Sequence, residues 1–314
     1  MKTTLAKRLP AVMMCAGLML TAVACGTTDG SEAGSTSGSN GPTSATIKPY
    51  DVSGIKKDSA IAALVPSSVT DDSQLTVGME TSYAPAEFLE SDGKTPTGYD
   101  VDLTNAIARV WGLKSNPTSA SFDSIIPAIG SKYDLGISSF TITKDREQTV
   151  DMVSYYKAGM SYVVKKGNPE KVQAADMCGV SLGVQTGTIE EQEADTNSKK
   201  CTADGKKAIG VQSFKMQTDA TTAVLTGKID AFYADSPVAG YAIAQTGKQL
   251  QTVGEDEGVV PQGIVIKKGD RKLGEAVQKT MQKFIDDGTY GKILKHWGVQ
   301  GGAITKAELN PAVE

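Results

Sequence analysis

Short strand-like segments alternate with helix-like segments along most of this chain. The strand-like segments are apolar or alternating runs at residues 74–78, 133–137, 161–165, 180–184, 229–233 and 263–266. The helix-like segments, most with apolar residues at helical spacing, lie at 99–111, 122–129, 219–225, 272–287 and 290–297. Repeated alternation of this kind favours an α/β fold with largely parallel sheets. Ligands of such folds bind near the carboxyl ends of the strands.

Three residues mark helix ends. Gly112 and Gly227 each follow a predicted helix and are typical C-cap residues. Thr143 can cap the N-terminus of a short helix whose first turn holds Asp145 and Glu147, beside the positive end of the helix dipole. The predicted helices therefore have defined boundaries.

The charge balance excludes some classes of function. The 314 residues, enough for roughly two domains, include 32 Lys and Arg against 36 Asp and Glu. Three basic residues (Lys2, Lys7 and Arg8) lie in the first 24 positions, which hold no acids, so the remainder carries 29 − 36 = −7 charges. A mildly acidic body argues against nucleic acid as a partner. One histidine and four cysteines leave little for a metal site, and we expect neither metal nor cofactor.

Residues 1–24 have the pattern of a secretory signal, because a basic stretch precedes an apolar run at 11–23 that is too short to span a membrane. Small residues and then Cys25 follow, an order that resembles a bacterial lipobox, in which the cysteine is lipidated. Ordinary cleavage near Ala24, which leaves a free thiol, is the alternative. Residues 25–46 would be the lipidated cysteine and a flexible Gly/Ser/Thr linker. We therefore expect an extracytoplasmic protein, anchored to the outer face of the cell membrane by lipid on Cys25.

Several short sequences, taken together and in order, resemble the amino-acid-type (family 3) solute-binding proteins of bacterial ABC importers. They are YAPAEF at 83–88, GYDVDL at 98–103, FDSIIP at 122–127, KYDLGISSFTIT at 132–143 with Arg146, GVQTGT at 183–188, KIDA at 228–231, DSPVA at 235–239 and DGTY at 287–290. None is decisive alone, but their shared order over residues 74–298 is highly specific.

The resemblance implies a periplasmic-binding-protein-like fold of type II. Such a protein has two α/β lobes joined by two crossing strands and closes on ligand like a hinge. By analogy the crossings fall near residues 162–166 and 263–267. Lobe 1 would comprise residues 47–163 plus 264–314, and lobe 2 residues 164–263. We expect a monomer that binds an amino acid or similar zwitterion and delivers it to a membrane permease.

The resemblance also implies a site for both charges of an amino acid. Arg146 matches the arginine that binds the ligand carboxylate, for which its planar fork is suited. Backbone N–H groups near Thr141 and Thr188 would add donors. Asp235 matches the aspartate that binds the ammonium group. Without the resemblance, Arg146 would read as a solvated helix residue and Asp235 as an ordinary turn residue.

Further positions would complete this site. Ser139 matches a position whose side chain or carbonyl also reaches the ammonium group, and Ser138 is its neighbour. Tyr83 and Phe122 match the aromatic positions that enclose the aliphatic part of the ligand. Either aromatic residue can instead be a packing residue.

The sequence leaves the side chain of the ligand open. Glu80 stands where some relatives place an acid that meets this side chain, and a carboxylate there suits a cationic or amide group. The alternative is a surface charge at a strand end. Gln185 can also reach the ligand side chain. Ala86 and Ile189 replace an aromatic residue and a threonine that relatives often carry, so the pocket can be wider and lacks one hydroxyl.

Two cysteines remain after the signal region, Cys178 and Cys201. Because an exported protein meets an oxidising compartment, we expect a disulfide that closes a loop of about 24 residues; two unpaired thiols are the alternative.

The leading function is a receptor that makes and breaks no bonds. A ligand-binding sensor for a separate signalling partner and a dehydratase-like enzyme, with Glu80 and Asp235 as its acid–base pair, are the alternatives.

Overall fold

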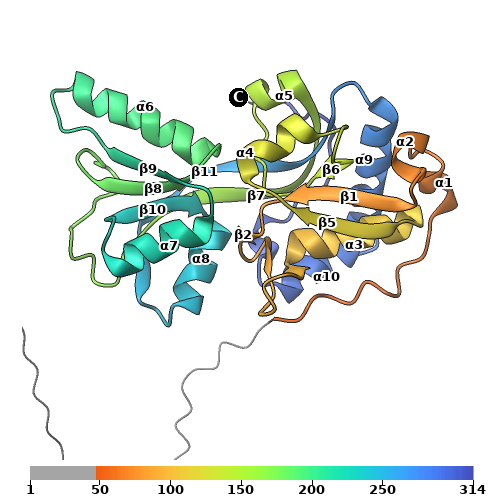
Figure 1. Cartoon of the computed structure of the whole chain (residues 1–314), viewed down its shortest axis with the longest axis horizontal. Coiled ribbons are helices and arrows are strands. Elements are labelled where there is room, and N and C mark those ends of the chain that lie inside the picture. The colour runs from red at the N-terminus through yellow and green to blue at the C-terminus, as the bar shows by residue number, and fades with distance from the viewer. Residues whose placement is uncertain (1–46, 314) are drawn as a thin grey trace, which may run out of the picture. The chain divides into compact units, whose positions relative to one another are not determined.

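The central feature of the fold is an eight-stranded mixed sheet with strand order β5-β1-β6-β11-β7-β10-β8-β9 (Figure 1). The structure, a computed structural model, describes residues 47–313. The strands of this sheet are β1 (Gln74–Met79), β5 (Lys114–Ser119), β6 (Leu135–Gly136), β7 (Val150–Lys165), β8 (Ser181–Gln185), β9 (Gly210–Phe214), β10 (Ala231–Asp235) and β11 (Leu250–Lys267). A second sheet consists of β2 (Ser82–Tyr83), β3 (Glu87–Leu89) and β4 (Pro96–Thr97).

Two groups of parallel strands flank two long antiparallel strands. The β1 group consists of β5, β1 and β6, and the β8 group consists of β10, β8 and β9. Strands β7 and β11 pair with each other, while β11 also pairs with β6 and β7 also pairs with β10. Figure 1 shows β7 and β11 running from one group to the other. This arrangement confirms the predicted α/β fold, with parallel pairing confined to the two outer groups.

Helices cover both groups of strands. They are α1 (Ser59–Ala62), α2 (Ser67–Thr70), α3 (Tyr99–Trp111), α4 (Phe122–Ile125), α5 (Lys144–Thr149), α6 (Ile189–Ala203), α7 (Gln217–Thr226), α8 (Ser236–Gln245), α9 (Arg271–Asp286) and α10 (Thr289–His296), with 3-10 turns at Ile126–Ala128 and Gln300–Gly302. In Figure 1, α6 lies above the strands of the β8 group, and α7 and α8 lie below them.

The predicted helix ends agree with the structure. Helix α3 spans the predicted residues and ends at Gly112, whose φ of 75° is left-handed. Gly227 closes α7 in the same conformation. The side chain of Thr143 accepts a hydrogen bond from the backbone N–H of Arg146 at the start of α5. Local capping chemistry therefore sets the position of Arg146.

Several elements were not predicted, among them β5, β9, α6 and α8. Strand β5 has the sequence KSNPTS, which shows neither an apolar run nor alternation. Helix α6 is mostly polar, and only Glu190, Ala194 and Cys201 are buried along it. The prediction of a strand at 133–137 was too long, because β6 covers only Leu135–Gly136.

The predicted disulfide is present. Cys178 and Cys201 are bonded, with their Cα atoms 5.6 Å apart. The bond attaches α6 to the segment before β8. Leu182 and Val184 in β8 and Ala194 in α6 belong to one buried apolar cluster, which is separate from the main core. The disulfide therefore fixes a helix whose own sequence offers few apolar contacts.

Within residues 47–313, the helices are too short or too polar to cross a bilayer. The predicted signal at 1–24, the lipid site at Cys25 and the predicted linker up to residue 46 lie outside the described residues. The predicted lobe boundaries, at residues 163–164 and 263–264, stay a proposal.

Candidate functional site

A small cavity lies between residues that adjoin the β1 group and residues that adjoin the β8 group. Its volume is about 10 Å³. It is lined by Tyr83, Phe122, Ser138, Ser139, Thr141, Arg146, Gln185, Thr188, Ile189, Glu190 and Asp235. Every residue predicted to bind ligand, apart from Glu80, belongs to this set, and Ile189 and Glu190 are additions to it. The structure thus gathers the predicted residues in one place, whereas their contact with a ligand stays a prediction.

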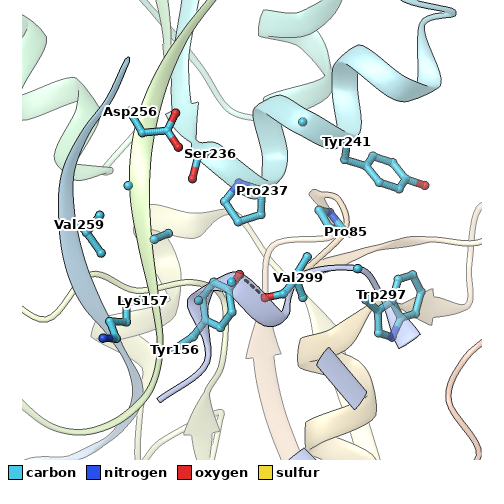
Figure 2. Close-up of a pocket in the computed structure, with 16 residues that line it drawn as sticks. Pro85, Tyr156, Lys157, Ser236, Pro237, Tyr241, Asp256, Val259, Trp297 and Val299 are labelled. Atoms are coloured by element: carbon cyan, nitrogen blue, oxygen red, sulfur yellow. Dashed lines mark hydrogen bonds between the residues drawn. The ribbon is translucent and has the colours of Figure 1, made fainter. Parts of the chain in front are cut away.

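A larger cavity of about 610 Å³ opens between α8, the residues at 297–302 and the middle of β7 and β11 (Figure 2). Its aromatic walls include Tyr156, Tyr241 and Trp297, and its charged residues, Lys157 and Asp256, are exposed. None of the predicted ligand-binding residues lines it. Because a zwitterion held away from water needs buried charges, the small cavity is the candidate site.

The guanidinium of Arg146 forms one wall of the small cavity. Its Nη1 donates to the carbonyl of Thr141 (2.7 Å), and its Nη2 donates to the carbonyl of Gly187 in the turn between β8 and α6 (3.1 Å). It stacks over the rings of Phe122 and Phe140, with its Cζ 5.5 and 5.7 Å from the ring centroids. Burial lowers its pKa. Among residues 47–313 it has no salt-bridge partner, so its charge is free to bind an anion.

Asp235 forms the opposite wall, at the end of β10 and the N-cap of α8. Its Oδ2 accepts hydrogen bonds from Tyr83 Oη (3.0 Å) and Gln262 Nε2 (2.8 Å). Its backbone N–H donates to the same Tyr83 hydroxyl (3.1 Å). Burial raises the pKa of Asp235 to about 7. Gln262 was not predicted, because a single glutamine within a strand gives no signal of what it faces.

Glu80 lies just behind the cavity wall and is 4% exposed, so the alternative of a surface charge is wrong. Its Oε2 accepts from Ser82 Oγ (2.8 Å) and from Gln185 Nε2 (2.7 Å). Ser82 Oγ in turn accepts from the backbone N–H of Gln217, the first residue of α7 (2.8 Å). Glu80 therefore reaches the cavity through Gln185, which lines it.

Glu190 is a residue of the cavity that sequence reasoning missed. Thr188 caps α6 by accepting from the backbone N–H of Glu191, which places Glu190 in the first turn of the helix at the cavity. Glu190 is 4% exposed. Burial, with the nearby Asp235 carboxylate, raises its pKa to about 8. The usable signal was Thr188 as an N-cap followed by acidic residues, which predicts carboxylates in the first helical turn.

The serines line the cavity from the loop after β6. Ser138 Oγ donates to Glu87 Oε1 (2.6 Å) and accepts from the backbone N–H of Glu80 (3.0 Å). The backbone N–H of Ser139 lies 3.3 Å from Asp100 Oδ2 and 3.2 Å from Tyr155 Oη. Ser139 has a φ of 49°, in the left-handed region that non-glycine residues rarely adopt. The loop is thus held in an uncommon conformation by groups beneath it.

Both sequence and structure resemble known solute-binding proteins. Residues 75–300 match the family of bacterial extracellular solute-binding proteins, family 3. The arginine-binding protein ArgT of Corynebacterium glutamicum is 30% identical over 252 residues, which are 80% of this chain and 82% of that protein. An ancestral arginine-binding protein, solved bound to arginine, is 34% identical, with a TM-score of 0.67 over 72% of this chain and 98% of that chain. An ancestral amino acid-binding protein, a precursor of cyclohexadienyl dehydratase, is 32% identical, with a TM-score of 0.65 over 73% and 97%.

Proposed function

Because the chain belongs to family 3 of the bacterial extracellular solute-binding proteins, we propose that it is the receptor of an ABC importer for an amino acid with a cationic side chain. The charge pattern of the small cavity carries this proposal. Arg146 faces the cavity without a salt-bridge partner among residues 47–313, and the buried carboxyl groups of Asp235 in β10 and Glu190 in α6 also face it. A ligand with one carboxylate and two cationic groups complements this pattern.

The main-chain charges of the ligand fit Arg146 and Asp235. Two N–H groups of Arg146 are bonded to carbonyls, and a guanidinium has five, so the others are left for a carboxylate. Asp235 would bind the ammonium group through a charge-assisted hydrogen bond worth about 1.5–3 kcal/mol. Tyr83 and Phe122 line the space between these charges and would enclose the aliphatic stem.

The remaining acids favour a cationic side chain. Once Arg146 and Asp235 are matched by the ligand's own carboxylate and ammonium group, Glu190 is left as a buried carboxyl group that faces the cavity. Glu80 adds a second carboxyl group behind Gln185. A buried carboxylate without a cation is costly, so these groups select a positively charged side chain and disfavour an acidic one. Two relatives are named for arginine, which makes arginine the first ligand to test.

Ligand exchange requires the two lobes to separate. A cavity of about 10 Å³ holds no amino acid, and three hydrogen-bonded pairs cross it: Tyr83 with Asp235, Arg146 with Gly187, and Glu80 with Gln185. Lobe 1 (47–163 plus 264–314) would turn from lobe 2 (164–263) about β7 and β11. The closed, liganded monomer would then dock on its permease. Lipid on Cys25 would keep it beside the membrane.

Binding without chemistry is the favoured function because the candidate acid–base groups are engaged. Glu80 accepts from Ser82 and Gln185, and Asp235 accepts from Tyr83 and Gln262. A dehydratase-like enzyme would convert its bound ligand, so recovering the ligand unchanged after incubation separates the two functions. A sensor would bind the same ligand but would not support its uptake.

Calorimetric titration of the purified protein with arginine, lysine, ornithine, histidine, glutamine and glutamate tests the proposal. We expect binding of the cationic amino acids and none of glutamate. Saturation at 100 times the dissociation constant should stabilise the fold by about 2.7 kcal/mol. Arg146→Ala should abolish binding. Lys144→Ala, an exposed change two residues away in α5, is the matched control and should bind as the wild type does.

The ligand side chain is tested by Glu190→Gln. This change should lower the preference for arginine over glutamine by about tenfold or more, because a neutral amide replaces a buried carboxylate. Glu170→Gln, on the exposed surface, is its control. Equal binding of arginine and glutamate by the wild type, or binding that survives Arg146→Ala, would contradict the proposed site.

A further inference from the structure

A pair of buried carboxyl groups lies beneath the serine loop of the small cavity. Glu87 is in β3 and Asp100 is in the first turn of α3, and both are 0% exposed. The two carboxyl groups are close enough for each to shift the pKa of the other. Neither residue lines the cavity, and the proposed binding of ligand uses neither directly. The burial of two neighbouring carboxyl groups, away from the cavity, therefore needs its own explanation.

The hydrogen bonds around the pair require a proton between the two acids. Glu87 Oε1 accepts from Ser138 Oγ, and Asp100 Oδ2 accepts from Tyr155 Oη (2.8 Å) and the backbone N–H of Ser139. The other two oxygens, Glu87 Oε2 and Asp100 Oδ1, are buried and receive no hydrogen bond from a donor among residues 47–313. Both oxygens are acceptors and two adjacent buried carboxylates repel, so we expect one proton between the two groups.

The same contacts indicate which acid carries the proton. Asp100 accepts from two donors and stands in the first turn of α3, near the positive end of the helix dipole, so its charge is stabilised. Glu87 accepts from one hydroxyl. Burial and the charge of Asp100 raise the pKa of Glu87 well above its usual range, whereas the pKa of Asp100 rises to about 6. The proton therefore belongs to Glu87, which donates to Asp100.

We propose that Glu87 and Asp100 share one proton and that this bonded pair is a positioning element, which holds Ser138 and Ser139 in the geometry that ligand binding needs. Glu87 holds the hydroxyl of Ser138, and Asp100 holds the backbone N–H of Ser139 at its left-handed φ. Ser138 Oγ also accepts a hydrogen bond from the backbone N–H of Glu80, so the position of Ser138 affects that of Glu80. Only the ligand-binding part of the inference rests on the proposed function; the shared proton does not.

Loss of the shared proton should loosen the loop. Two adjacent buried carboxylates repel, and the bond between Glu87 and Asp100 is lost with the proton. The titratable groups that act on the pair are Glu80 before β2, Tyr99 in α3, Tyr155 and Tyr156 in β7, Asp235 in β10 and Tyr290 in α10. The four tyrosines stay neutral near pH 7, because burial raises their pKa values above 10. The two carboxyl groups, Glu80 and Asp235, can only add negative charge, which favours retention of the proton.

Infrared spectroscopy of the ligand-free protein tests the proton directly. At neutral pH we expect carbonyl stretches of protonated carboxyl groups, shifted in heavy water, from Glu87 together with Asp235 and Glu190, and we expect Glu87→Gln to lose the contribution of Glu87. The glutamine amide can donate from Nε2 to Asp100 and accept from Ser138 at Oε1, so it keeps the bonds of the pair without a titrating proton. A wild-type spectrum whose protonated-carboxyl band is unchanged in Glu87→Gln would overturn the shared proton.

Titration with arginine tests the positioning role. Glu87→Leu leaves Ser138 without its acceptor and Asp100 without its donor, so it should weaken binding by about tenfold or more. Glu87→Gln should rescue binding to within about threefold of the wild type at neutral pH. Thr104→Val, which removes another buried hydroxyl from α3, is the matched control and should leave binding unchanged.

The pH profile separates positioning from a merely structural role. On the alkaline side the ligand's own ammonium group loses its proton equally for every variant, so the comparison is between wild type and Glu87→Gln. The wild type should lose affinity at a lower pH than Glu87→Gln. Superimposable profiles, or a Glu87→Gln protein that binds as weakly as Glu87→Leu, would overturn the positioning role.

If Glu87→Leu does not fold, the infrared spectrum and the pH profile of Glu87→Gln still test the proposal. If the wild type binds no amino acid, the proposed function fails while the infrared result stands.

Discussion

At the scale of single residues, the site could be predicted where a residue belongs to a short sequence that resembles the family. Arg146 and Asp235 were predicted as charges of the site because they match the family pattern, and both line the cavity. Glu190 was missed because it lies in α6, whose sequence shows no buried face. Gln262 and Glu87 were missed because their roles depend on partners distant in the chain.

The raised pKa values of Asp235 and Glu190 predict that arginine binding depends on pH. Both groups are raised by burial, to about 7 and about 8, so near neutrality the free protein holds protons that a cationic ligand must displace. The affinity for arginine should therefore rise as the pH increases through 7 and 8. Calorimetry in buffers of different ionisation enthalpy should detect proton release on binding at pH 7. Glu190→Gln should release fewer protons than Glu170→Gln, and equal release by the two variants would contradict the assignment.

The pKa of Glu87 predicts a stability effect of opposite sign. The folded state keeps a proton that the unfolded chain loses above the ordinary glutamate pKa, so the free energy of unfolding falls as the pH rises between the unfolded and the folded pKa values. Glu87→Gln cannot titrate there. Urea unfolding at several pH values should show the wild type losing stability relative to Glu87→Gln as the pH rises. A constant difference between the two proteins would show that Glu87 is ionised in the folded state.

At the scale of elements, boundaries with a clear cap could be predicted, whereas elements stabilised by tertiary contacts could not. Strand β5 has only polar residues and one proline, and it forms because it can pair with β1. Helix α3 combines both situations. Its end at Gly112 was predicted, but its start depends on a close approach to the carbonyls of residues 85 and 86, which no local pattern reveals.

Gly98 is the residue that permits this close approach. Its φ is 128°, and a Cβ there would lie 2.1 Å from the carbonyl oxygen of Ala86. Gly98→Ala should therefore lower the free energy of unfolding by more than about 2 kcal/mol. Gly93→Ala, at a positive φ but with open space around it, should cost only about 1 kcal/mol. Urea denaturation of both variants measures the difference, and equal losses would show that the close approach is not what matters.

The disulfide should stabilise the protein without serving the binding site. It closes a loop of about 24 residues, so replacing Cys178 and Cys201 together by serine should lower the free energy of unfolding by about 3 kcal/mol. Because Glu190 lies eleven residues before Cys201 on α6, arginine affinity near 25 °C should change little. Thermal unfolding and calorimetry measure the two effects separately. A large loss of affinity would show that the bond positions the N-terminus of α6.

At the scale of the whole molecule, the fold class followed from the alternation of strands and helices, and the antiparallel middle of the sheet did not. Pairing of β7 with β11 joins residues more than 80 positions apart, such as Lys165 and Leu250. Such pairing depends on how the complete chain packs rather than on either strand. The predicted fold class was therefore right, whereas the sheet is mixed rather than largely parallel.

Closure on ligand is the prediction that belongs to this scale. If lobe 1 turns away from lobe 2 when the cavity is empty of ligand, arginine should reduce the radius of gyration measured by X-ray scattering. Arg146→Ala should show no such change at the same arginine concentration, because it lacks the group that binds the carboxylate. Lys144→Ala should contract as the wild type does. Unchanged dimensions of the wild type at saturating arginine would contradict hinge closure.

The side-by-side course of β7 and β11 has a consequence for how such receptors can diversify. Val150 is the register partner of Lys267, and Lys165 is the register partner of Leu250, so the chain between the two strands departs and returns at neighbouring points. A segment whose ends lie together can be exchanged as a cassette. Recombination at these strands would keep Arg146 from one parent and take Glu190 and Asp235 from another. New ligand preferences could then arise by shuffling intact halves, before any point mutation refines them.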